Sequence, residues 1–281
     1  MAWRLGRKFD GWEFQANGVL WRLLPARSGV FVGEDRDLTS KTVSFFCVDR
    51  KTGRLQWNVP PPGERWWSGV EAVHEKFVLL HEFAAPDLPD HRKIITLDLA
   101  TGRYRWANAE LKFLFLAGDS IYASRDLYDR REFFELDITD GRILREVDGA
   151  SVNVLREQLP AEGPEGLVFP GRLDEAGLEA IVPAEDLIRR GEMLENAEHI
   201  AIDGFDVLSY HVREARPALL SHRLVVIRKR GRKVVHSDRL IADAASAVPD
   251  AFFAIAVMLY YVREKRTLCA LDLSTGIGRS D

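Results

Sequence analysis

The segment Val48-Asp49-Arg50-Lys51-Thr52-Gly53-Arg54-Leu55-Gln56-Trp57 decides the fold, because the chain repeats it. A second copy, Leu97-Asp98-Leu99-Ala100-Thr101-Gly102-Arg103-Tyr104-Arg105-Trp106, keeps the aspartate, the Thr-Gly pair and the tryptophan. A third pair, Thr275-Gly276, again follows an aspartate, Asp272, by three residues. Glycine allows a positive φ in a tight turn, and Asp and Thr side chains can bond the backbone amides of that turn. The motif therefore predicts a β-hairpin.

Degenerate copies of this turn recur along the whole chain. Asp137 precedes Gly141, with Asp140 in place of the threonine, and two further turn glycines follow apolar runs without the aspartate. The turn glycines are at positions 53, 102, 141, 191, 231 and 276. A spacing near 45 residues is typical of a four-stranded propeller blade. The sequence thus predicts an all-β fold, a six-bladed β-propeller of four-stranded antiparallel blades that forms a single domain over residues 1–281.

The repeat also predicts where each blade begins and ends. We expect blades at about 18–60, 66–108, 111–148, 151–196, 199–240 and 241–281. The residues after Gly276 are too few for a fourth strand in the last blade. We therefore expect residues 1–9 to supply its outer strand and so to close the ring.

The pattern of aspartate, two residues, Thr-Gly, three residues and tryptophan resembles the repeat of the quinoprotein alcohol dehydrogenase-like propellers, the pyrroloquinoline-quinone-type repeat. The resemblance covers the turn in four of the six expected blades and is complete at Trp57 and Trp106. It implies that each tryptophan docks against the neighbouring blade. Quinone-binding members usually have eight blades, and many carry adjacent cysteines, which this chain lacks. We expect the chain to bind no cofactor. We also expect it to belong to a small uncharacterised bacterial family of such propellers.

Repetition itself marks these residues as architectural. A structural role is therefore assigned to Asp49, Thr52, Gly53, Trp57, Asp98, Thr101, Gly102, Trp106, Asp137, Gly141, Asp272, Thr275 and Gly276.

Composition narrows the environment and the partners. The net charge of −4 gives no broad attraction to nucleic acid, and the basic run from Arg228 to Lys233 is interpreted as a solvated hairpin tip. The apolar stretch from Ala251 to Val262 is too short to span a bilayer, and the N-terminus does not resemble a signal peptide. We expect a cytoplasmic protein with neither a nucleic-acid nor a membrane partner.

Motifs that carry chemistry are absent from the sequence. The seven histidines form no HExxH motif, and there is no G-x-S-x-G motif, P-loop or dinucleotide fingerprint. We expect no metal site, although histidines from several blades could meet around the axis without a signal in their spacing.

Function is therefore sought on the loops between strands and blades, which several charged and aromatic residues occupy. Loops at 33–37, 87–92, 125–131 and 213–222 and the connector 60–67 are expected on one face. The candidate binding residues are Arg65, Trp66, Trp67, His91, Arg125, Arg130 and His222. The plainer interpretation is that the two tryptophans cover a wedge between blades while the charges keep the rim soluble.

The expected function is a noncatalytic binding or scaffold module that contacts a protein or peptide partner through this face. One alternative is a hydrolase or lyase with a metal or carboxylate site in the axial funnel. Another is a receptor for a small ligand in the channel. The oligomeric state is left open.

Overall fold

The computed structural model describes residues 9–84, 90–160, 163–181, 194–213, 219–249 and 251–276. The chain divides into two compact units, one of residues 17–164 and one of residues 1–16 with 165–281. The single domain predicted over residues 1–281 stays a prediction.

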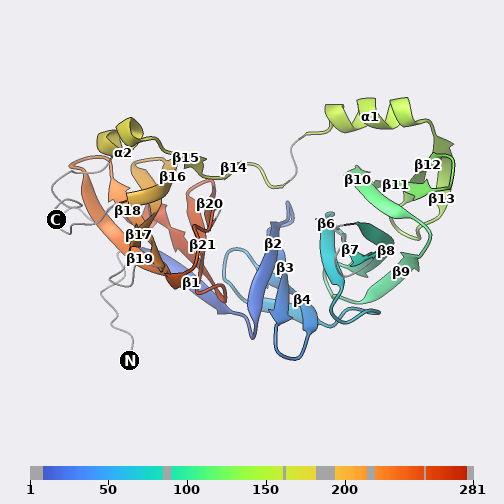
Figure 1. The fold of residues 1–281 in the computed structure, drawn as a ribbon, viewed down its shortest axis with the longest axis horizontal. Helices are drawn as coiled ribbons and strands as arrows, with labels where there is room; N and C mark the ends of the chain where they lie inside the picture. Colours follow the sequence, from blue (N-terminus) through green and yellow to red (C-terminus); the bar gives the residue numbers. More distant parts are fainter. Residues whose placement is uncertain are drawn as a thin grey trace. The chain divides into compact units, whose positions relative to one another are not determined.

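Residues 17–164 form three four-stranded antiparallel sheets in which consecutive strands are neighbours (Figure 1). This is the strand order of a propeller blade. The first sheet contains β2 (Val19–Pro25), β3 (Val30–Asp37), β4 (Thr42–Asp49) and β5 (Leu55–Val59); the second contains β6 (Ser68–Val73), β7 (Phe77–Phe83), β8 (His91–Asp98) and β9 (Tyr104–Asn108); the third contains β10 (Lys112–Ala117), β11 (Ser120–Asp126), β12 (Arg131–Asp137) and β13 (Ile143–Val147).

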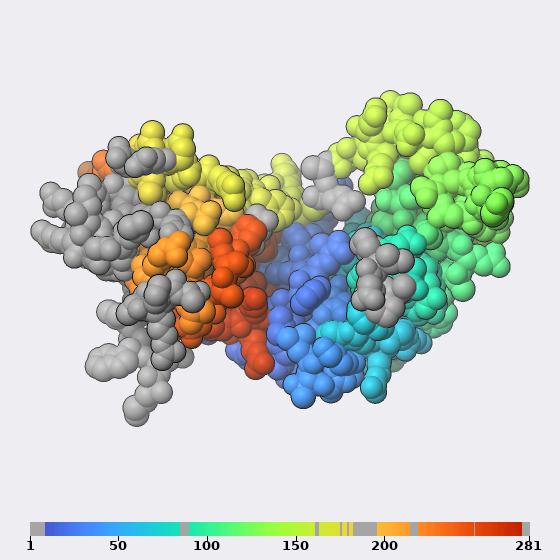
Figure 2. Space-filling model, viewed as in Figure 1, coloured from blue at the N-terminus to red at the C-terminus, as the bar shows by residue number. Residues whose placement is uncertain are grey.

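The three sheets pack face against face. Val32 and Phe45 of the first sheet share one apolar cluster with Leu80 of the second. Leu79 points to the other face of the second sheet and joins a cluster with Leu136 of the third. Successive residues of a strand face opposite sides, so the middle sheet contributes to both clusters. The blue and cyan surfaces of the first two sheets accordingly adjoin in Figure 2.

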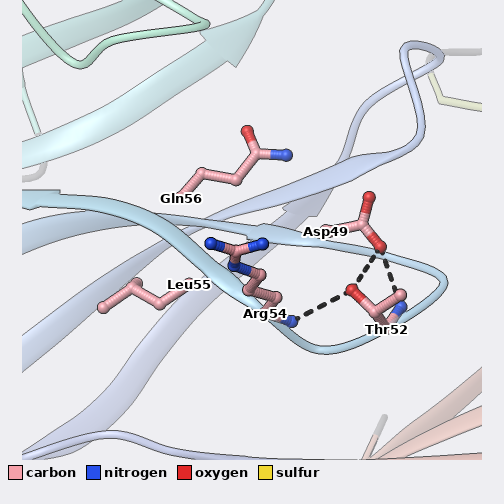
Figure 3. Close-up of a pocket in the computed structure, with 5 residues that line it drawn as sticks. All are labelled: Asp49, Thr52, Arg54, Leu55 and Gln56. Carbon is pink, nitrogen blue, oxygen red and sulfur yellow. Dashed lines mark hydrogen bonds between the residues drawn. The ribbon is translucent and has the colours of Figure 1, made fainter.

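The Thr-Gly turn joins the third and fourth strands of the first sheet. Asp49 Oδ1 accepts hydrogen bonds from the Thr52 amide at 2.8 Å and from Thr52 Oγ1 at 2.7 Å (Figure 3). Gly53 has φ +69° and donates to the Asp49 carbonyl at 2.8 Å. The hollow beside this turn is lined by Asp49, Thr52, Arg54, Leu55 and Gln56, and Asp49 Oδ1 and Thr52 Oγ1 already accept hydrogen bonds within the turn.

The same bonds recur in the other copies. Thr101 donates to Asp98 from its amide at 2.9 Å and from Oγ1 at 2.7 Å. In the third sheet Thr139 takes this part beside Asp137, and Gly141 has φ +73°. In the last copy Ser274 donates to Asp272. Thr275 instead accepts from the Asp10 amide at 3.0 Å.

Each repeat tryptophan packs on the turn glycine of the following sheet. An added Cβ at Gly102 would lie 2.8 Å from the Trp57 ring, and one at Gly141 would lie 2.6 Å from the Trp106 ring. The third sheet has Arg145 at the corresponding place, and Arg145 pairs with Glu135 on its own sheet at 2.7 Å. Helix α1 (Gly149–Gln158) follows, and its Val152 packs on Phe115 and Tyr122.

Residues 165–281 with residues 1–16 form two five-stranded antiparallel sheets. The fourth sheet contains β15 (Gly171–Arg172), β16 (Leu194–Ile202), β17 (Phe205–Arg213), β18 (Leu220–Arg228) and β19 (Lys233–Ala244), and the fifth contains β1 (Asp10–Gln15), β22 (Thr267–Asp272), β21 (Met258–Arg263), β20 (Phe252–Ile255) and β14 (Leu167–Val168). Helix α2 (Glu175–Ile181) follows β15, and the 3-10 turn η1 (Leu273–Gly276) follows β22.

The described residues thus form five sheets, in place of the six predicted blades. The segment 151–196 builds no four-stranded sheet of its own within its described part. Asp148 caps α1 by accepting from the Ser151 amide at 3.0 Å, while β14 and β15 pair with the fifth and fourth sheets. Gly191, on which the extra blade depended, lies outside the described residues.

The N-terminal part of the chain supplies the outer strand of the fifth sheet, as the sequence predicted, but through residues 10–15. The pairing runs from Asp10 opposite Asp272 to Gln15 opposite Thr267. Residues 1–8 lie outside the described part of the chain. Trp12 pairs with Ala270, two residues before the turn aspartate, just as Trp57 pairs with Cys47. Trp12 therefore occupies the repeat tryptophan position of the fifth sheet.

Phe9 packs on the glycine of the last turn, as Trp57 and Trp106 pack on the turn glycines of the second and third sheets. An added Cβ at Gly276 would lie 2.1 Å from the Phe9 ring, which is 3% exposed and packs edge-on against Phe205. The fourth sheet has His236 at its repeat tryptophan position, opposite Val226, and Phe9 also contacts that ring. A phenylalanine from the N-terminal segment thus does what tryptophan does elsewhere.

No described helix has both the length and the apolar character required to cross a membrane.

Candidate functional site

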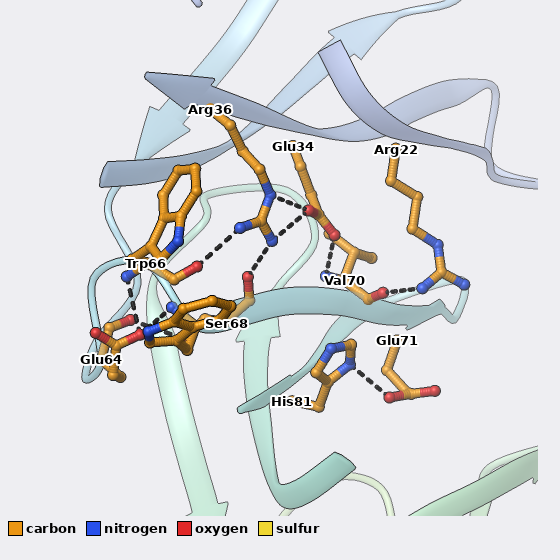
Figure 4. A network of polar contacts seen from close by, with 10 residues as sticks. Arg22, Glu34, Arg36, Glu64, Trp66, Ser68, Val70, Glu71 and His81 are labelled. Atoms are coloured by element: carbon orange, nitrogen blue, oxygen red, sulfur yellow. Dashed lines mark hydrogen bonds and ion pairs between the residues drawn. The ribbon is translucent and has the colours of Figure 1, made fainter. Parts of the chain in front are cut away.

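A buried ion pair lies where the first sheet meets the second. Arg36 donates from Nε and Nη2 to Glu34 Oε2 at 3.0 and 2.8 Å, and both residues are at most 5% exposed (Figure 4). Glu34 Oε1 accepts the Val70 amide at 2.8 Å. The sequence placed residues 33–37 in a surface loop, but they belong to β3, where these bonds hold the two sheets together.

The same guanidinium fixes the connector between the two sheets. Arg36 donates to the carbonyls of Trp66 at 2.8 Å and of Ser68 at 2.6 Å. The Glu64 carboxylate accepts the amides of Trp66, at 2.9 Å, and of Trp67. Side chains therefore bind both the N–H groups and the carbonyl groups of the connector backbone. This fixes the backbone that carries Trp66 and Trp67.

Aromatic and cationic side chains gather above this connector. The Trp66 ring has Arg36 Cζ at 5.2 Å and Lys41 Nζ at 4.9 Å from its centroid. Arg36 also lies 5.6 Å from the ring of Trp21, which is 63% exposed. Trp67 packs edge-on against Trp66 at 6.3 Å. We call Trp21, Lys41, Arg65, Trp66 and Trp67 the tryptophan surface.

The tryptophans of this surface differ in exposure. Trp66 and Trp67 are half-buried, which agrees in part with their interpretation as wedge covers, while Arg65 and Lys41 are exposed. Among the described residues, neither Lys41 nor Arg65 takes part in an ion pair. The surface therefore combines fixed aromatic rings with two cationic groups that are open to solvent.

A second cluster lies on the neighbouring face of the second sheet. Glu71 on β6 approaches His81 Nδ1 on β7 at 2.6 Å and His91 Nδ1 on β8 at 2.8 Å, both through Oε2. The two imidazoles are stacked with centroids 3.5 Å apart and planes 11° apart. Phe83 packs edge-on against both rings. Figure 4 shows the contact of Glu71 with His81.

Burial and charge set the state of the Glu71 carboxyl. Burial raises its pKa, and the adjacent His81 and His91 imidazoles more than offset this, so that the pKa falls to about 2. The carboxylate is therefore ionised at neutral pH. Together the three side chains offer one anionic oxygen and two imidazole nitrogens, a set of ligand atoms suited to a divalent metal ion.

The predicted binding residues do not form one site. Arg65, Trp66 and Trp67 lie on the connector, and His91 belongs to the cluster with Glu71. Arg125 and Arg130 lie on the third sheet and its loop, where both are paired with Glu132, at 2.7 and 2.8 Å.

His222 is not on the surface that the sequence predicted for it. It lies inside β18, fully buried and stacked on His211 with centroids 4.0 Å apart. Strand pairing places His211 directly opposite His222, so both rings enter the sheet interior. Burial, and then the neighbouring His211, lowers the pKa of His222 to about 3. Parts of the predicted loops, residues 85–89 and 214–218, lie outside the described residues.

Sequence reasoning missed the cluster because it looked for histidines from several blades. Glu71, His81 and His91 instead come from adjacent strands of one sheet. Their equal spacing of ten residues was the available signal, since hairpins of this length return the chain to the same end of a sheet.

The comparisons with known proteins give a family description without a function. Residues 25–106, covering most of the first two sheets, match a family model described as a domain of unknown function, DUF4905. That description names neither the quinoprotein superfamily nor an activity. No curated protein matches the chain.

Several solved structures are similar over most of the chain, at low identity. The β-propeller domain of Cps50 (Swd1) from Myceliophteria thermophila has a TM-score of 0.32 and 10% identity, covering 89% of this chain and 67% of that one. A DUF4221 family member from Bacteroides vulgatus has 0.34 and 8%, covering 94% and 96%. The β-propeller domain of the Trilobed protease from Pyrococcus furiosus has 0.32 and 9%, covering 88% and 64%.

Proposed function

We propose that the protein is a noncatalytic binding module whose tryptophan surface contacts an acidic segment of a protein partner. The single observation that supports this is the Trp66 ring, which lies within cation–π distance of both Arg36 and Lys41 on a connector whose backbone is fixed. Rigid aromatic rings bind with little loss of conformational freedom, and Trp and Arg are enriched at binding hot spots.

The charges around Trp66 support an acidic partner. Arg36 is already neutralised by Glu34, and the nearby Glu64 carboxylate is occupied by two backbone amides. Lys41 and Arg65 are the cations that remain open to solvent on this surface. Carboxylates on a partner would meet these cations, and an apolar side chain beside them would rest on Trp21 or Trp66.

The enzymatic alternative would draw on different groups. A metal or carboxylate site of a hydrolase or lyase would use Glu71, His81 and His91, which lie within one sheet. The binding role is the stronger proposal because the fixed tryptophan rings and the exposed Lys41 and Arg65 support it directly.

A selection from a random peptide library tests the binding role. We expect enriched peptides to combine Asp or Glu with an aromatic or aliphatic residue, and their binding to weaken as salt increases. Trp66→Ala and the double variant Lys41→Glu/Arg65→Glu should each reduce binding by at least about tenfold, as expected for a hot spot.

The matched control is Arg130→Glu, which reverses an exposed charge that already pairs with Glu132 on the third sheet. It should bind the selected peptides like the wild type. Peptides without acidic enrichment, or equal binding by Trp66→Ala, would overturn the proposal.

A further inference from the structure

We propose that Glu71, His81 and His91 bind one divalent transition-metal ion, with Zn²⁺ as the foremost candidate, through a carboxylate oxygen and the two Nδ1 atoms. This site is separate from the tryptophan surface and does not depend on the binding role. Two imidazoles and one carboxylate are a common set of protein ligands for zinc, with a further position left for water.

The first support is the way the sheet is distorted at this cluster. The strand pairs that correspond to β7 and β8 in the other sheets, β3 with β4, β11 with β12, β17 with β18 and β21 with β22, are continuous. In the second sheet it shifts between Leu80 and Glu82, beside His81, and Lys93 on the opposite strand has φ +63°. A left-handed lysine costs energy and is retained where a local feature requires it. The second sheet therefore departs from the regular strand pairing of the repeat at the position of this cluster.

A bulge on the other side of His81 projects Glu71. The register of β6 and β7 shifts between Val70 and Ala72, which makes Glu71 the extra residue. The first and third sheets have bulges at the corresponding places, Trp21 and Leu114, so the repeat supplies the bulge and this sheet alone places a carboxylate there. Bulges re-aim side chains and occur often beside functional sites.

The second support is the environment of His81. The residue is 2% exposed, and neither ring nitrogen is aligned for a hydrogen bond with a protein group. Its Nδ1 nevertheless lies 2.6 Å from Glu71 Oε2. A carboxylate oxygen and an imidazole nitrogen this close together can bind one ion, and Nε2 of the same buried ring has no hydrogen-bond partner among the described residues.

Binding a zinc ion would require this cluster to open, with the stacked His81 and His91 rings turning so that each Nδ1 lone pair points to the ion. Bond lengths near 2.0–2.2 Å place neighbouring ligands of a tetrahedral ion about 3.3 Å apart. The observed separations from Glu71 Oε2 are 2.6 and 2.8 Å. The nearby Lys93 charge is matched by Glu82 at 2.8 Å. His91 is 32% exposed, so the ion would exchange with solvent from that side.

Zinc titration of the chelator-treated full chain by isothermal calorimetry tests this proposal. We expect one Zn²⁺ per chain, a higher melting temperature with Zn²⁺, and a visible spectrum of low-coordinate cobalt when Co²⁺ replaces it. His91→Gln and Glu71→Gln should each weaken Zn²⁺ binding by at least about tenfold and remove the thermal shift.

The control is His74→Gln, which changes a histidine of the same sheet that contacts Asp119 at 3.3 Å and should leave Zn²⁺ binding unchanged. Circular dichroism and melting without metal show that each variant is folded, and the partly exposed His91 variant decides the matter if Glu71→Gln does not fold. No heat of binding by the wild type, or equal Zn²⁺ affinity in His91→Gln, would overturn the proposal.

Discussion

Trp57 donates its indole Nε1–H to the main-chain carbonyl of Leu99 at 2.7 Å. The bond runs from the outer strand of the first sheet to the Thr-Gly turn of the second. Trp106 makes the same bond to Ile138 of the third sheet at 2.9 Å. The repeat motif therefore has two parts that act together: the tryptophan of one sheet packs on the Thr-Gly turn of the next sheet and donates a hydrogen bond to it.

Gly102→Ala should test this docking, because it adds a methyl group against the Trp57 ring. A positive φ alone costs an alanine about 1 kcal/mol, and overpacking against a buried ring adds about 1–3 kcal/mol. Gly118→Ala is a matched control, since Gly118 has φ +58° and nothing within 4 Å of an added Cβ. Urea unfolding should show a larger loss of stability for Gly102→Ala. Equal losses would mean that Trp57 does not constrain the turn.

This two-part motif explains which sheets the sequence could predict. The turn could be identified because Asp49, Thr52 and Gly53 have roles fixed by backbone chemistry. In the first and second sheets, the tryptophan also predicts that another turn of the same kind follows in the next sheet. Arg145 occupies the tryptophan position of the third sheet, and α1 begins at the Asp148 cap. Counting turn glycines without requiring the tryptophan therefore predicted a sixth blade.

Phe9→Ala should destabilise the unit that contains the fourth and fifth sheets. Phe9 packs on Gly276 and on Phe205, and its truncation leaves a cavity between the two sheets. Such a change typically costs about 3–5 kcal/mol. Phe169→Ala removes the same atoms from a ring that is 58% exposed and should cost far less. Thermal unfolding of both variants measures the difference, and a Phe9→Ala midpoint like that of Phe169→Ala would contradict the docking of Phe9.

Arg36→Met should be strongly destabilising, because it leaves the Glu34 carboxylate buried without its counter-ion. Breaking a buried pair from one side costs about 3–5 kcal/mol. The double variant Glu34→Gln/Arg36→Met removes both charges and keeps an acceptor for the Val70 amide, so it should recover part of that loss. Arg125→Met breaks the more exposed pair with Glu132 and should cost about 0–1 kcal/mol. Chemical denaturation of the wild type, Arg36→Met, Glu34→Gln and the double variant gives the coupling, and additive losses of the two single variants would argue against the pair.

The candidate site was less predictable than the fold. Trp66 and Trp67 could be proposed from residue type, but their fixation by Arg36 and Glu64 depends on contacts between segments far apart in sequence. The glutamate–histidine cluster depends on two bulges, and simple alternation along a strand does not indicate them. His222 was misplaced because a histidine in a charged segment resembles a surface residue, whereas its strand continues into the core.

His222 should make the protein sensitive to acid. Its pKa in the folded state is about 3, below the ordinary value of 6.5, because burial and His211 disfavour the charged ring. The unfolded chain therefore takes up this proton first as the pH falls. The contribution to stability is complete above about pH 6.5 and is lost progressively toward pH 3, on the order of a few kcal/mol.

His222→Leu removes this titration with little change of volume, so its unfolding free energy should fall less steeply over that pH range. His199→Gln, which alters a partly exposed histidine paired with Asp206 at 2.9 Å, keeps His222 and should retain the steep decline. Urea unfolding at a series of pH values compares the slopes of the three proteins. The His222→Leu variant has no imidazole at this position. An equally steep decline in its stability would therefore show that other titratable groups cause the acid sensitivity.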